Sequence, residues 1–166
     1  SSGPVFFRQE RVGRHGRLFR IHKLRTMRID AVQRGPAITG PDDPRVTRAG
    51  RWLRHYRVDE LPQLIDVIAG HMSLVGPRPE LPRFVALYPP ELRERVLAVR
   101  PGITDPASLE FADEANLLAG SADPERTYVD AILPRKLRLQ VEYAERASWV
   151  TDLAVIGRTL RMLAER

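Results

Sequence analysis

The chain has 166 residues, and its 27 lysines and arginines against 21 aspartates and glutamates give a net charge of +6, which predicts anionic partners. This length suits one domain over residues 1–166, and contents of 43% hydrophobic and 29% charged residues exclude a disordered chain. The absence of cysteine excludes disulfides and thiolate metal sites, and no apolar run reaches the ~20 residues of a membrane-spanning helix.

Two extended segments open the chain. Residues 5–11 and 18–24 are separated by a turn that contains Gly13 and Gly16, and residues 18–24 alternate apolar and basic side chains. This period of two predicts a β-hairpin with one buried face and one basic face. Basic side chains that are merely solvated would give the same pattern, so the hairpin alone indicates no ligand.

A helix is predicted to follow a loop with Gly-Pro pairs at residues 35–36 and 40–41. Asp43 would cap this helix and Pro44 would occupy its first position. One face of the helix is apolar and holds Val46, Ala49, Trp52, Leu53 and Tyr56. The other face is a basic ridge of Arg45, Arg48, Arg51 and Arg54, which is either a solvated surface or part of an anion site.

Further helices are predicted from apolar spacing. A short, mostly buried helix over residues 60–69 carries Leu61, Leu64, Ile65 and Ile68 and ends at Gly70. Residues 81–87 and 90–99 are predicted to form two more helices, and residues 100–104 a loop. A further helix, capped by residues 123–125, is interrupted or restarted at Pro134 and reaches Tyr143. We therefore expect an α+β fold, a mainly helical single domain with a small N-terminal β-hairpin.

The last helix, over residues 149–166, is amphipathic. Its apolar residues are Trp149, Leu153, Ile156, Leu160 and Leu163, and Arg158, Arg161 and Arg166 lie on or beside its polar side. Two interpretations stay open: the apolar stripe packs on the core, or the helix lies on an anionic membrane.

The adjacent acids Asp59 and Glu60 follow the basic ridge and begin the apolar helix. A carboxylate can attack phosphorus when cations neutralise the electrophile, and the product is an acyl phosphate. Mg²⁺ suits this reaction because it binds one or two carboxylates together with phosphate oxygens. The alternative is structural: Asp59 caps the helix, and Glu60 interacts with the helix dipole.

Arg78 lies between Pro77 and Pro79, which restrict the backbone on both sides and so fix the origin of its side chain. This favours a preorganised phosphate clamp, although a salt bridge in a rigid turn explains the same pattern. Arg100, in an Arg-Pro-Gly segment, is a weaker candidate of the same kind. The histidines lack metal-ligand spacing, and the aromatic residues do not alternate with bases as nucleic-acid stacking requires.

Five motifs occur in order at residues 9–13, 19–27, 57–63, 72–79 and 100–104. They read Gln-Glu-Arg-Val-Gly, Phe-Arg-Ile-His-Lys-Leu-Arg-Thr-Met, Arg-Val-Asp-Glu-Leu-Pro-Gln, Met-Ser-Leu-Val-Gly-Pro-Arg-Pro and Arg-Pro-Gly-Ile-Thr. In these motifs the chain resembles the bacterial sugar transferase family, the monotopic polyprenyl-phosphate phosphoglycosyl transferases that begin glycan assembly on a lipid carrier. The resemblance covers nearly the whole chain and is tighter over residues 5–104 than after them.

The resemblance implies a two-step exchange on the cytoplasmic face of the bacterial inner membrane. Asp59 would attack the sugar-linked phosphate of a UDP-sugar and release UMP, and undecaprenyl phosphate would then take the phosphosugar from the enzyme. Glu60 matches the residue associated with Mg²⁺, for which Asp59 is the second candidate ligand. Arg54 and Arg78 match residues associated with the phosphates, and Arg25 and Arg100 of the same motifs join this set. Nucleic acid is not an expected partner.

Three features depart from the family pattern. Family members carry a hydrophobic re-entrant helix ahead of the hairpin, and we expect that membrane anchor to lie outside these 166 residues. Asp105 stands where the family usually has glycine, and Ala112 stands near a position where relatives often have arginine. These differences leave a second hypothesis open, a module of the same fold that binds nucleotide-sugar or acidic lipid without turnover. A third hypothesis is an arginine-rich nucleic-acid binder.

Overall fold

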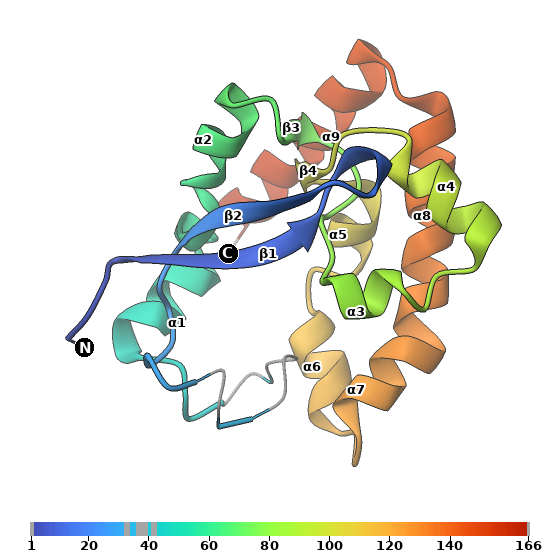
Figure 1. The fold of residues 1–166 in the computed structure, drawn as a ribbon. Helices are drawn as coiled ribbons and strands as arrows, with labels where there is room; N and C mark the ends of the chain where they lie inside the picture. The colour runs from blue at the N-terminus through green and yellow to red at the C-terminus, as the bar shows by residue number, and fades with distance from the viewer. Residues whose placement is uncertain (1, 32–33, 36–39, 41–42, 166) are drawn as a thin grey trace.

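The computed structural model describes residues 2–31, 34–35, 40 and 43–165 of the chain. Its fold is α+β and mainly helical, with a small antiparallel hairpin near the N-terminus, as predicted (Figure 1). The hairpin pairs β1 (Phe6–Val12) with β2 (Leu18–Leu24), so that Phe6 lies opposite Leu24 and Val12 lies opposite Leu18. A short turn, η1 (Arg14–Gly16), connects the two strands.

The hairpin is followed by α1 (Arg48–His55), the 3₁₀ turn η2 (Val58–Glu60) and α2 (Gln63–Ile68). Two three-residue strands, β3 (Ser73–Val75) and β4 (Gly102–Thr104), pair in parallel, with α3 (Pro82–Val85) and α4 (Pro90–Leu97) between them in the chain. The C-terminal part contains α5 (Pro106–Glu110), α6 (Glu114–Ala119), α7 (Pro124–Thr127), the π-helical segment η3 (Tyr128–Ile132), α8 (Leu133–Arg146) and α9 (Trp149–Ala164). Figure 1 shows the hairpin across the front, with α1 and α2 on one side and α4 and α8 on the other.

The main buried cluster is built on α8. It joins residues of β1, α3, α4, η3 and α8, among them Val12, Phe84, Val96, Ile132, Leu137 and Val141. A smaller cluster joins Val75 of β3, Tyr143 of α8 and Val155 of α9. Both clusters use α8, so this helix holds the hairpin and the β3–β4 pair in a fixed relation.

Two glycines allow the β3–β4 pair to form next to the Pro-Arg-Pro segment. A Cβ on Gly76 would lie 2.3 Å from the carbonyl oxygen of Arg100, and a Cβ on Gly102 would lie 2.1 Å from the backbone nitrogen of Gly76. Gly102 N donates to Pro77 O at 3.0 Å, and Gly76 N donates to Thr104 O at 3.0 Å. This close approach of two backbones fixes the chain immediately before Arg78.

The helix predicted from Pro44 begins later than expected. α1 starts at Arg48, and its N-cap is Thr47, whose hydroxyl accepts a hydrogen bond from Gly50 N at 2.9 Å. The prediction that Asp43 caps this helix is wrong, because its carboxylate binds the guanidinium of Arg45 instead. Val46 lies ahead of the helix, in an isolated bridge with Met27. Pro36, Pro41 and Asp42 of the predicted loop and helix start lie outside the described residues.

The prediction that α2 is mostly buried is also wrong. Leu61 ahead of it and Leu64, Ile65 and Ile68 on it are exposed, Ile68 by 88%, whereas Gln63 and Asp66 are buried. The reason is Asp66, whose carboxylate accepts a hydrogen bond from His22 N at 2.9 Å and contacts His22 Nδ1 at 2.8 Å. These bonds to β2 turn the polar side of α2 inward. The helix ends before Gly70, which has a φ of +77°, as predicted.

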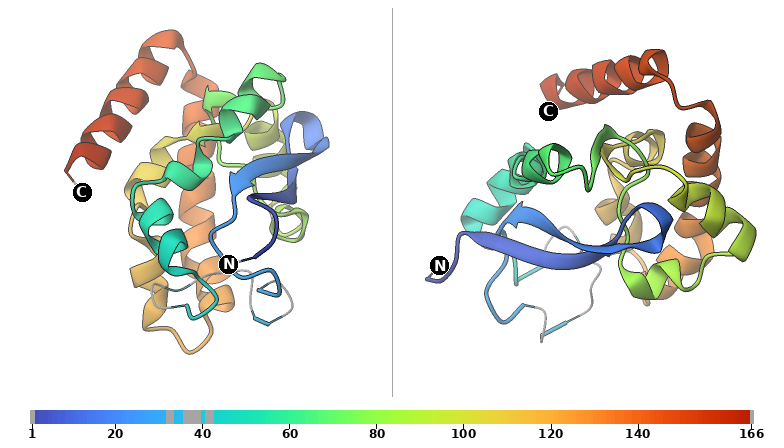
Figure 2. Two further views of the ribbon diagram at one scale, coloured as in Figure 1. Left: turned by 90° about the vertical axis from the view of Figure 1, so that its left-hand side faces the viewer. Right: turned by 45° about the horizontal axis from the view of Figure 1, so that its top comes forward.

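The apolar stripe predicted on the last helix is only partly packed. Val155 of α9 is buried, and Thr159 is hydrogen-bonded to Thr104 at 2.8 Å between hydroxyl oxygens, but Trp149, Leu153 and Leu160 are exposed. Figure 2 shows α9 along the outside of the molecule. The stripe therefore packs on the core only in part, through Ile156 beside Val155, and most of it is exposed. Within the described part of the chain, no helix combines the length and apolarity needed to cross a membrane.

Candidate active site

A cleft of about 910 Å³ lies between the hairpin, η2 and helices of the C-terminal half. Its lining includes five of the six predicted site residues, namely Arg25, Arg54, Asp59, Glu60 and Arg78. The sixth, Arg100, is exposed in the turn ahead of β4 and is not among the described residues that line the cleft. The fold thus brings most of the predicted site together.

A sharp change of direction after α1 places Asp59 and Glu60. Arg57 adopts the left-handed conformation, with φ 54° and ψ 19°, and η2 begins at the next residue. β2 packs against η2, and each acidic residue is only 8% exposed. The N-cap of α2 is Pro62, with no side-chain cap. The interpretation that Asp59 caps this helix is therefore wrong.

The Glu60 carboxylate is held between two cations. Lys23 Nζ donates to Oε1 at 2.6 Å, and the guanidinium of Arg78 donates to both oxygens, with Nη1 3.2 Å from Oε2. Burial raises the pKa of Glu60, but Arg78 and Lys23 outweigh it and hold that pKa well below its ordinary value. Glu60 in turn raises the pKa of Arg78. Arg78 thus forms a salt bridge in a rigid turn, and it also lines the cleft.

The Asp59 carboxylate, unlike that of Glu60, is not paired with a described residue. No described residue donates a hydrogen bond to it or forms an ion pair with it. Burial raises the pKa of Asp59; Lys23 lowers it, neighbouring Glu60 raises it further, and the net shift is upward. A carboxylate with a raised pKa and no internal partner is more basic, and so a better nucleophile, than one on the surface.

Two arginines of the predicted set are held at the cleft wall by hydrogen bonds. Arg54 Nε donates to Thr26 Oγ1 at 2.9 Å, and burial lowers the pKa of Arg54 while Asp59 opposes that effect. Arg25 Nε donates to the carbonyl oxygen of Pro4 at 2.7 Å. Arg54 is therefore close enough to Asp59 to feel its charge and lies in the same cleft.

Asp105, which departs from the family pattern, has a structural role behind the site. It is fully buried, and its Oδ1 accepts a hydrogen bond from Ser108 N at 2.6 Å, which caps α5. Its Oδ2 accepts from Gln140 Nε2 at 3.0 Å and from the backbone N–H of Arg78 at 3.3 Å. This one carboxylate therefore connects α5 and α8 to the Pro-Arg-Pro segment.

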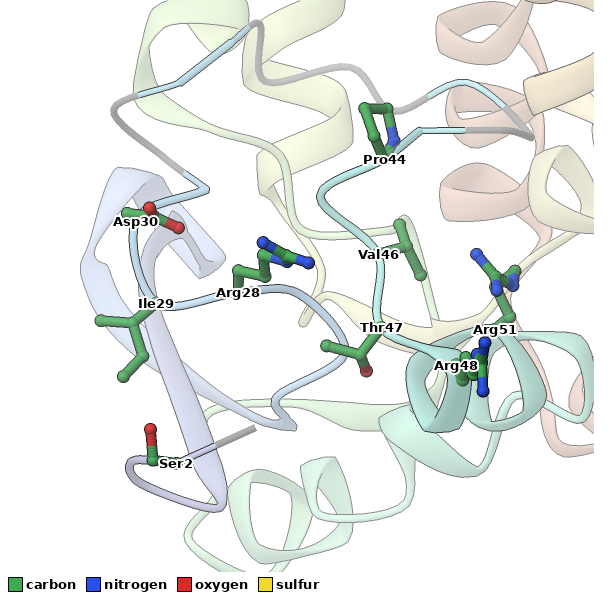
Figure 3. Close-up of a pocket in the computed structure, with 9 residues that line it drawn as sticks. All are labelled: Ser2, Arg28, Ile29, Asp30, Pro44, Val46, Thr47, Arg48 and Arg51. Atoms are coloured by element: carbon green, nitrogen blue, oxygen red, sulfur yellow. The ribbon is translucent and has the colours of Figure 1, made fainter.

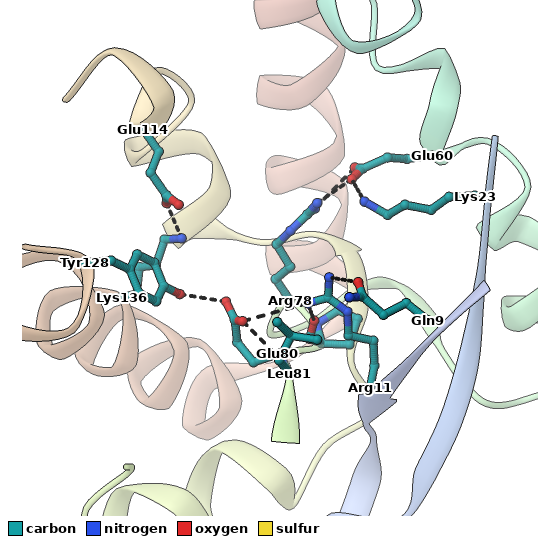
Figure 4. A network of polar contacts seen from close by, with 11 residues as sticks. Gln9, Arg11, Lys23, Glu60, Arg78, Glu80, Leu81, Glu114, Tyr128 and Lys136 are labelled. Atoms are coloured by element: carbon teal, nitrogen blue, oxygen red, sulfur yellow. Dashed lines mark hydrogen bonds and ion pairs between the residues drawn. The ribbon is translucent and has the colours of Figure 1, made fainter. Parts of the chain in front are cut away.

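A chain of polar contacts lines the other end of the cleft (Figure 4). Tyr128 donates its hydroxyl proton to Glu80 Oε1 at 2.7 Å, and Glu80 is 3.8 Å from Arg11 Nη1. Lys136 pairs with Glu114 and lies 5.0 Å above the ring of Tyr128. Because these groups are paired with one another, this end offers fixed donors and acceptors to a polar ligand.

The residues at Asp59 are compatible with the predicted Mg²⁺. Among the described residues, no three His, Cys, Asp or Glu side chains are grouped to hold a metal by themselves. Mg²⁺ does not need such a cage, because it keeps water and substrate phosphate oxygens as ligands beside one or two carboxylates. Glu60 Oε2 accepts one bond, from Arg78 Nη1, and Asp59 accepts none from the described residues, so both retain free lone pairs.

Sequence reasoning missed Lys23. In the period-two pattern of β2, Lys23 shares the side of Phe19 and Ile21, which face inward. A lysine on a buried face requires an anionic partner. That signal pointed to an acid nearby, and the structure identifies it as Glu60.

Comparison with known proteins identifies the family. A profile of bacterial sugar transferases matches residues 1–166, the whole of this chain. The chain belongs to the bacterial sugar transferase family. The resemblance inferred from the five motifs is therefore confirmed.

Several relatives match nearly all of the chain, including the following three. The uncharacterized sugar transferase EpsL of Bacillus subtilis (strain 168) is 37% identical over 158 residues, which are 95% of this chain and 69% of the relative. The UDP-N-acetylgalactosamine-undecaprenyl-phosphate N-acetylgalactosaminephosphotransferase of Aeromonas hydrophila is 36% identical over 165 residues, 98% of this chain and 36% of the relative. The UDP-glucose:undecaprenyl-phosphate glucose-1-phosphate transferase of Caulobacter vibrioides (strain ATCC 19089 / CIP 103742 / CB 15) is 39% identical over 168 residues, 98% of this chain and 58% of the relative. The chain thus spans 36 to 69% of the length of these relatives.

Proposed function

We propose that this chain transfers a sugar-1-phosphate from a UDP-sugar to undecaprenyl phosphate, at the start of bacterial surface glycan synthesis. The names of the Aeromonas and Caulobacter relatives describe sugar-phosphate transfer to undecaprenyl phosphate. The observation that carries the proposal is the Asp59 carboxylate. It lies in the cleft without a partner among the described residues, beside a Glu60 that Lys23 and Arg78 neutralise.

In the first step, a carboxylate oxygen of Asp59 attacks the phosphorus that carries the sugar. The new bond to Asp59 replaces the bond to the bridging oxygen of the diphosphate, and UMP leaves with that oxygen and its electron pair. The negative electrophile must be neutralised before a carboxylate can approach it, and Arg54 and Arg78 supply positive charge in the cleft. Asp59 has no ion pair with a described residue to break before it attacks.

In the second step, a phosphate oxygen of undecaprenyl phosphate attacks the phosphorus of the aspartyl phosphosugar. The bond between phosphorus and Asp59 breaks, its electron pair returns to the carboxylate, and the product is a lipid-linked diphosphate sugar. The raised pKa of Asp59 favours its role as nucleophile in the first step.

We include Mg²⁺ in this proposal, with Glu60 and Asp59 as its protein ligands. When bound, the ion would supply positive charge to the diphosphate oxygens. The chain's own contribution is to fix Glu60, because Lys23 and Arg78 hold its carboxylate at the edge of the cleft. The Glu60 carboxylate is therefore held in a fixed position, and Lys23 and Arg78, which hold it, also line the cleft that would bind the UDP-sugar.

We place the reaction at the cytoplasmic face of the inner membrane. The support is the exposed apolar side of α2, which carries Leu64, Ile65 and Ile68, together with exposed Trp52 and Tyr56 on α1. Exposed apolar and aromatic side chains of this kind mark an interaction site, and basic residues beside them suit anionic headgroups. A surface of this kind would bring the cleft within reach of a lipid-linked acceptor.

The test is UMP release from a panel of UDP-sugars with undecaprenyl phosphate and Mg²⁺ present. Wild type should release UMP with one sugar preferred, and Asp59→Asn should lower release at least about 10³-fold, because a nucleophile is lost. Asp130→Asn, at an exposed residue of η3, is the matched control and should retain wild-type release. If Asp59→Asn releases UMP as fast as wild type, Asp59 is not the nucleophile.

A second candidate function is a module that binds nucleotide-sugar without turnover. The observation in its favour is that Ala112 lines the cleft close to a place where an arginine is expected. UDP-sugar binding without UMP release from any sugar would favour this candidate. The nine other arginines that line the cleft favour the enzyme, because phosphate contacts do not depend on position 112 alone.

A further inference from the structure

A second cavity, of about 720 Å³, lies beside the active-site cleft at the start of α1 (Figure 3). Arg28 and Ile29 line both spaces, so the cavity and the cleft share a wall. Arg48 and Arg51 of α1 line the cavity on the side away from Ile29 in this view. Neither of these two arginines lines the cleft.

Backbone hydrogen bonds fix the two walls of this cavity to each other. Arg28 N donates to Arg45 O at 2.9 Å, and Thr47 N donates to Thr26 O at 2.9 Å. Between these bonds, Met27 and Val46 form the isolated bridge described above. These bonds hold residues 26–28 and 45–47 together, so the backbone on the two sides of the cavity keeps a fixed relation.

The cavity has an excess of positive charge. Among the described residues, no carboxylate pairs with Arg28, Arg48 or Arg51. Asp30, which also lines the cavity, is paired with Arg34 at 2.5 Å. Nearby Arg45, in contrast, is paired with Asp43 at 2.6 Å. Three arginines with no compensating acid in the described part of the chain attract an anion, and their forked donors match phosphate oxygens.

Apolar side chains adjoin this basic cavity. Ile29 in its wall is 63% exposed, and Trp52, which follows Arg48 by four residues and so neighbours it on the surface of α1, is 58% exposed. The Trp52 ring lies 5.2 Å from the ring of Tyr56, with which it forms an exposed aromatic pair on α1. Arginines with apolar and aromatic neighbours suit the membrane interface, where headgroup phosphates lie directly above acyl chains.

We propose that this cavity binds the headgroup phosphate of an anionic membrane phospholipid. A soluble phosphate ester has the same charged group, but the exposed Ile29 and Trp52 favour the lipid, whose acyl chains they would contact. Because Arg28 lines both spaces, the bound headgroup would lie next to the donor cleft without occupying it. The inference rests on the proposed function in that only an enzyme working at a membrane would meet this ligand.

The first test compares binding of the 166-residue chain to phosphatidylcholine vesicles with and without phosphatidylglycerol. Each basic residue near such a surface contributes roughly a factor of five, so Arg48→Gln/Arg51→Gln should bind the anionic vesicles about 30-fold more weakly. The control Arg93→Gln/Arg138→Gln removes the same charge from exposed residues of α4 and α8, and its binding should change less than about twofold. Equal weakening by both pairs would overturn the proposal, because net charge alone would then explain binding.

A second double variant distinguishes phosphate binding in a cavity from binding to a diffuse basic surface. Arg48→Lys/Arg51→Lys keeps the charge but removes the forked donors, so a phosphate cavity predicts about fivefold weaker vesicle binding. Wild-type binding by this variant would contradict the cavity. Glycerol 1-phosphate serves as a soluble phosphate ester for comparison. If Arg48→Gln/Arg51→Gln loses binding of this ester but keeps vesicle binding, the lipid is not the occupant and the proposal fails.

UMP release distinguishes failure of this inference from failure of the proposed function. Arg48→Gln/Arg51→Gln should release UMP at the wild-type rate in neutral detergent, and phosphatidylglycerol should stimulate wild type but not this variant. Stimulation that persists in the variant would overturn the inference. If wild type releases no UMP, the proposed function fails, and the vesicle measurements still decide whether the cavity binds the headgroup.

Discussion

The backbone N–H of Arg78 donates a hydrogen bond to the buried carboxylate of Asp105 at 3.3 Å. The same carboxylate caps α5 and accepts a bond from Gln140. The acid at position 105 therefore lies behind the cleft, where its oxygens accept hydrogen bonds from the fold. It ties the segment that carries Arg78 to the helices behind the cleft.

Removal of this carboxylate should destabilise the protein more than removal of an ordinary helix cap. We expect Asp105→Ala to lower the free energy of unfolding by about 2–4 kcal/mol, because three buried donors lose their acceptor. Asp123→Ala is the matched control, since Asp123 is an exposed cap that accepts only from Arg126 N among the described residues, and should cost about 1 kcal/mol. Urea denaturation measures both, and equal losses would contradict the connecting role of Asp105.

The Lys23–Glu60 contact should be a strongly coupled pair. Lys23→Met leaves Glu60 with one cation in a buried site, and we expect a loss of about 3–5 kcal/mol. A double-mutant cycle with Glu60→Gln should give a coupling energy of about 1–3 kcal/mol. The exposed pair of Arg126 and Asp130 is the control and should couple by less than about 0.5 kcal/mol. Additive losses at Lys23 and Glu60 would contradict the geometry of the site.

Asp59→Asn should stabilise the protein while it abolishes activity. Burial raises the pKa of Asp59 above its ordinary value of 3.8, so its ionised form is less stable in the folded chain than in the unfolded chain. Removal of the charge should therefore raise the free energy of unfolding at pH 7, and this gain should disappear below about pH 3.8. Unfolding measured between pH 3 and pH 8 tests this. A destabilised Asp59→Asn at pH 7 would show that the carboxylate has partners in the fold.

Glu60→Gln provides the control of opposite sign. The pKa of Glu60 lies well below its ordinary value of 4.5, so ionised Glu60 stabilises the fold above that pH. The stability that wild type has over Glu60→Gln should be constant above about pH 5.5 and should fall as the pH drops below 4.5 toward the folded-state pKa.

The apolar side of α2 should contribute to membrane binding and little to folding. Leu64→Ser and Ile68→Ser should each change the free energy of unfolding by less than about 0.5 kcal/mol, because both side chains are exposed. Leu137→Ala, in the main core, should cost about 2–5 kcal/mol. The double variant at Leu64 and Ile68 should also bind neutral vesicles more weakly than wild type. Severe destabilisation by either serine would mean that this side of α2 is packed.

Local sequence patterns predicted the elements that local chemistry determines. The hairpin followed from period-two alternation, and the cap of α7 followed from Asp123 ahead of Pro124, where the structure shows Asp123 accepting a bond from Arg126 N. The orientation of α2 could not be predicted in this way. Its apolar spacing indicated an inward face, but the buried Asp66 bonds His22 of β2, and a contact across 44 positions in the chain leaves no local signal.

In the site, too, local sequence predicted some features and long-range packing decided others. The sequence placed a nucleophile candidate next to arginines, and five of its six site residues line one cleft. Arg100 does not: its carbonyl oxygen lies against Gly76 in the close backbone approach ahead of Arg78, and the residue is exposed outside the cleft lining. The different states of Asp59 and Glu60 depend on Lys23, which reaches Glu60 only through the packing of β2 on η2.

The proposed mechanism requires a covalent bond between Asp59 and phosphorus. Intact-protein mass spectrometry of the chain with Mg²⁺ and each UDP-sugar, without undecaprenyl phosphate, tests it most directly. One UDP-sugar should add the mass of its sugar phosphate to wild type, peptide mapping should locate the adduct at Asp59, and addition of undecaprenyl phosphate should remove it. An adduct on another residue, or UMP release with no adduct at Asp59 under single-turnover conditions, would contradict the mechanism.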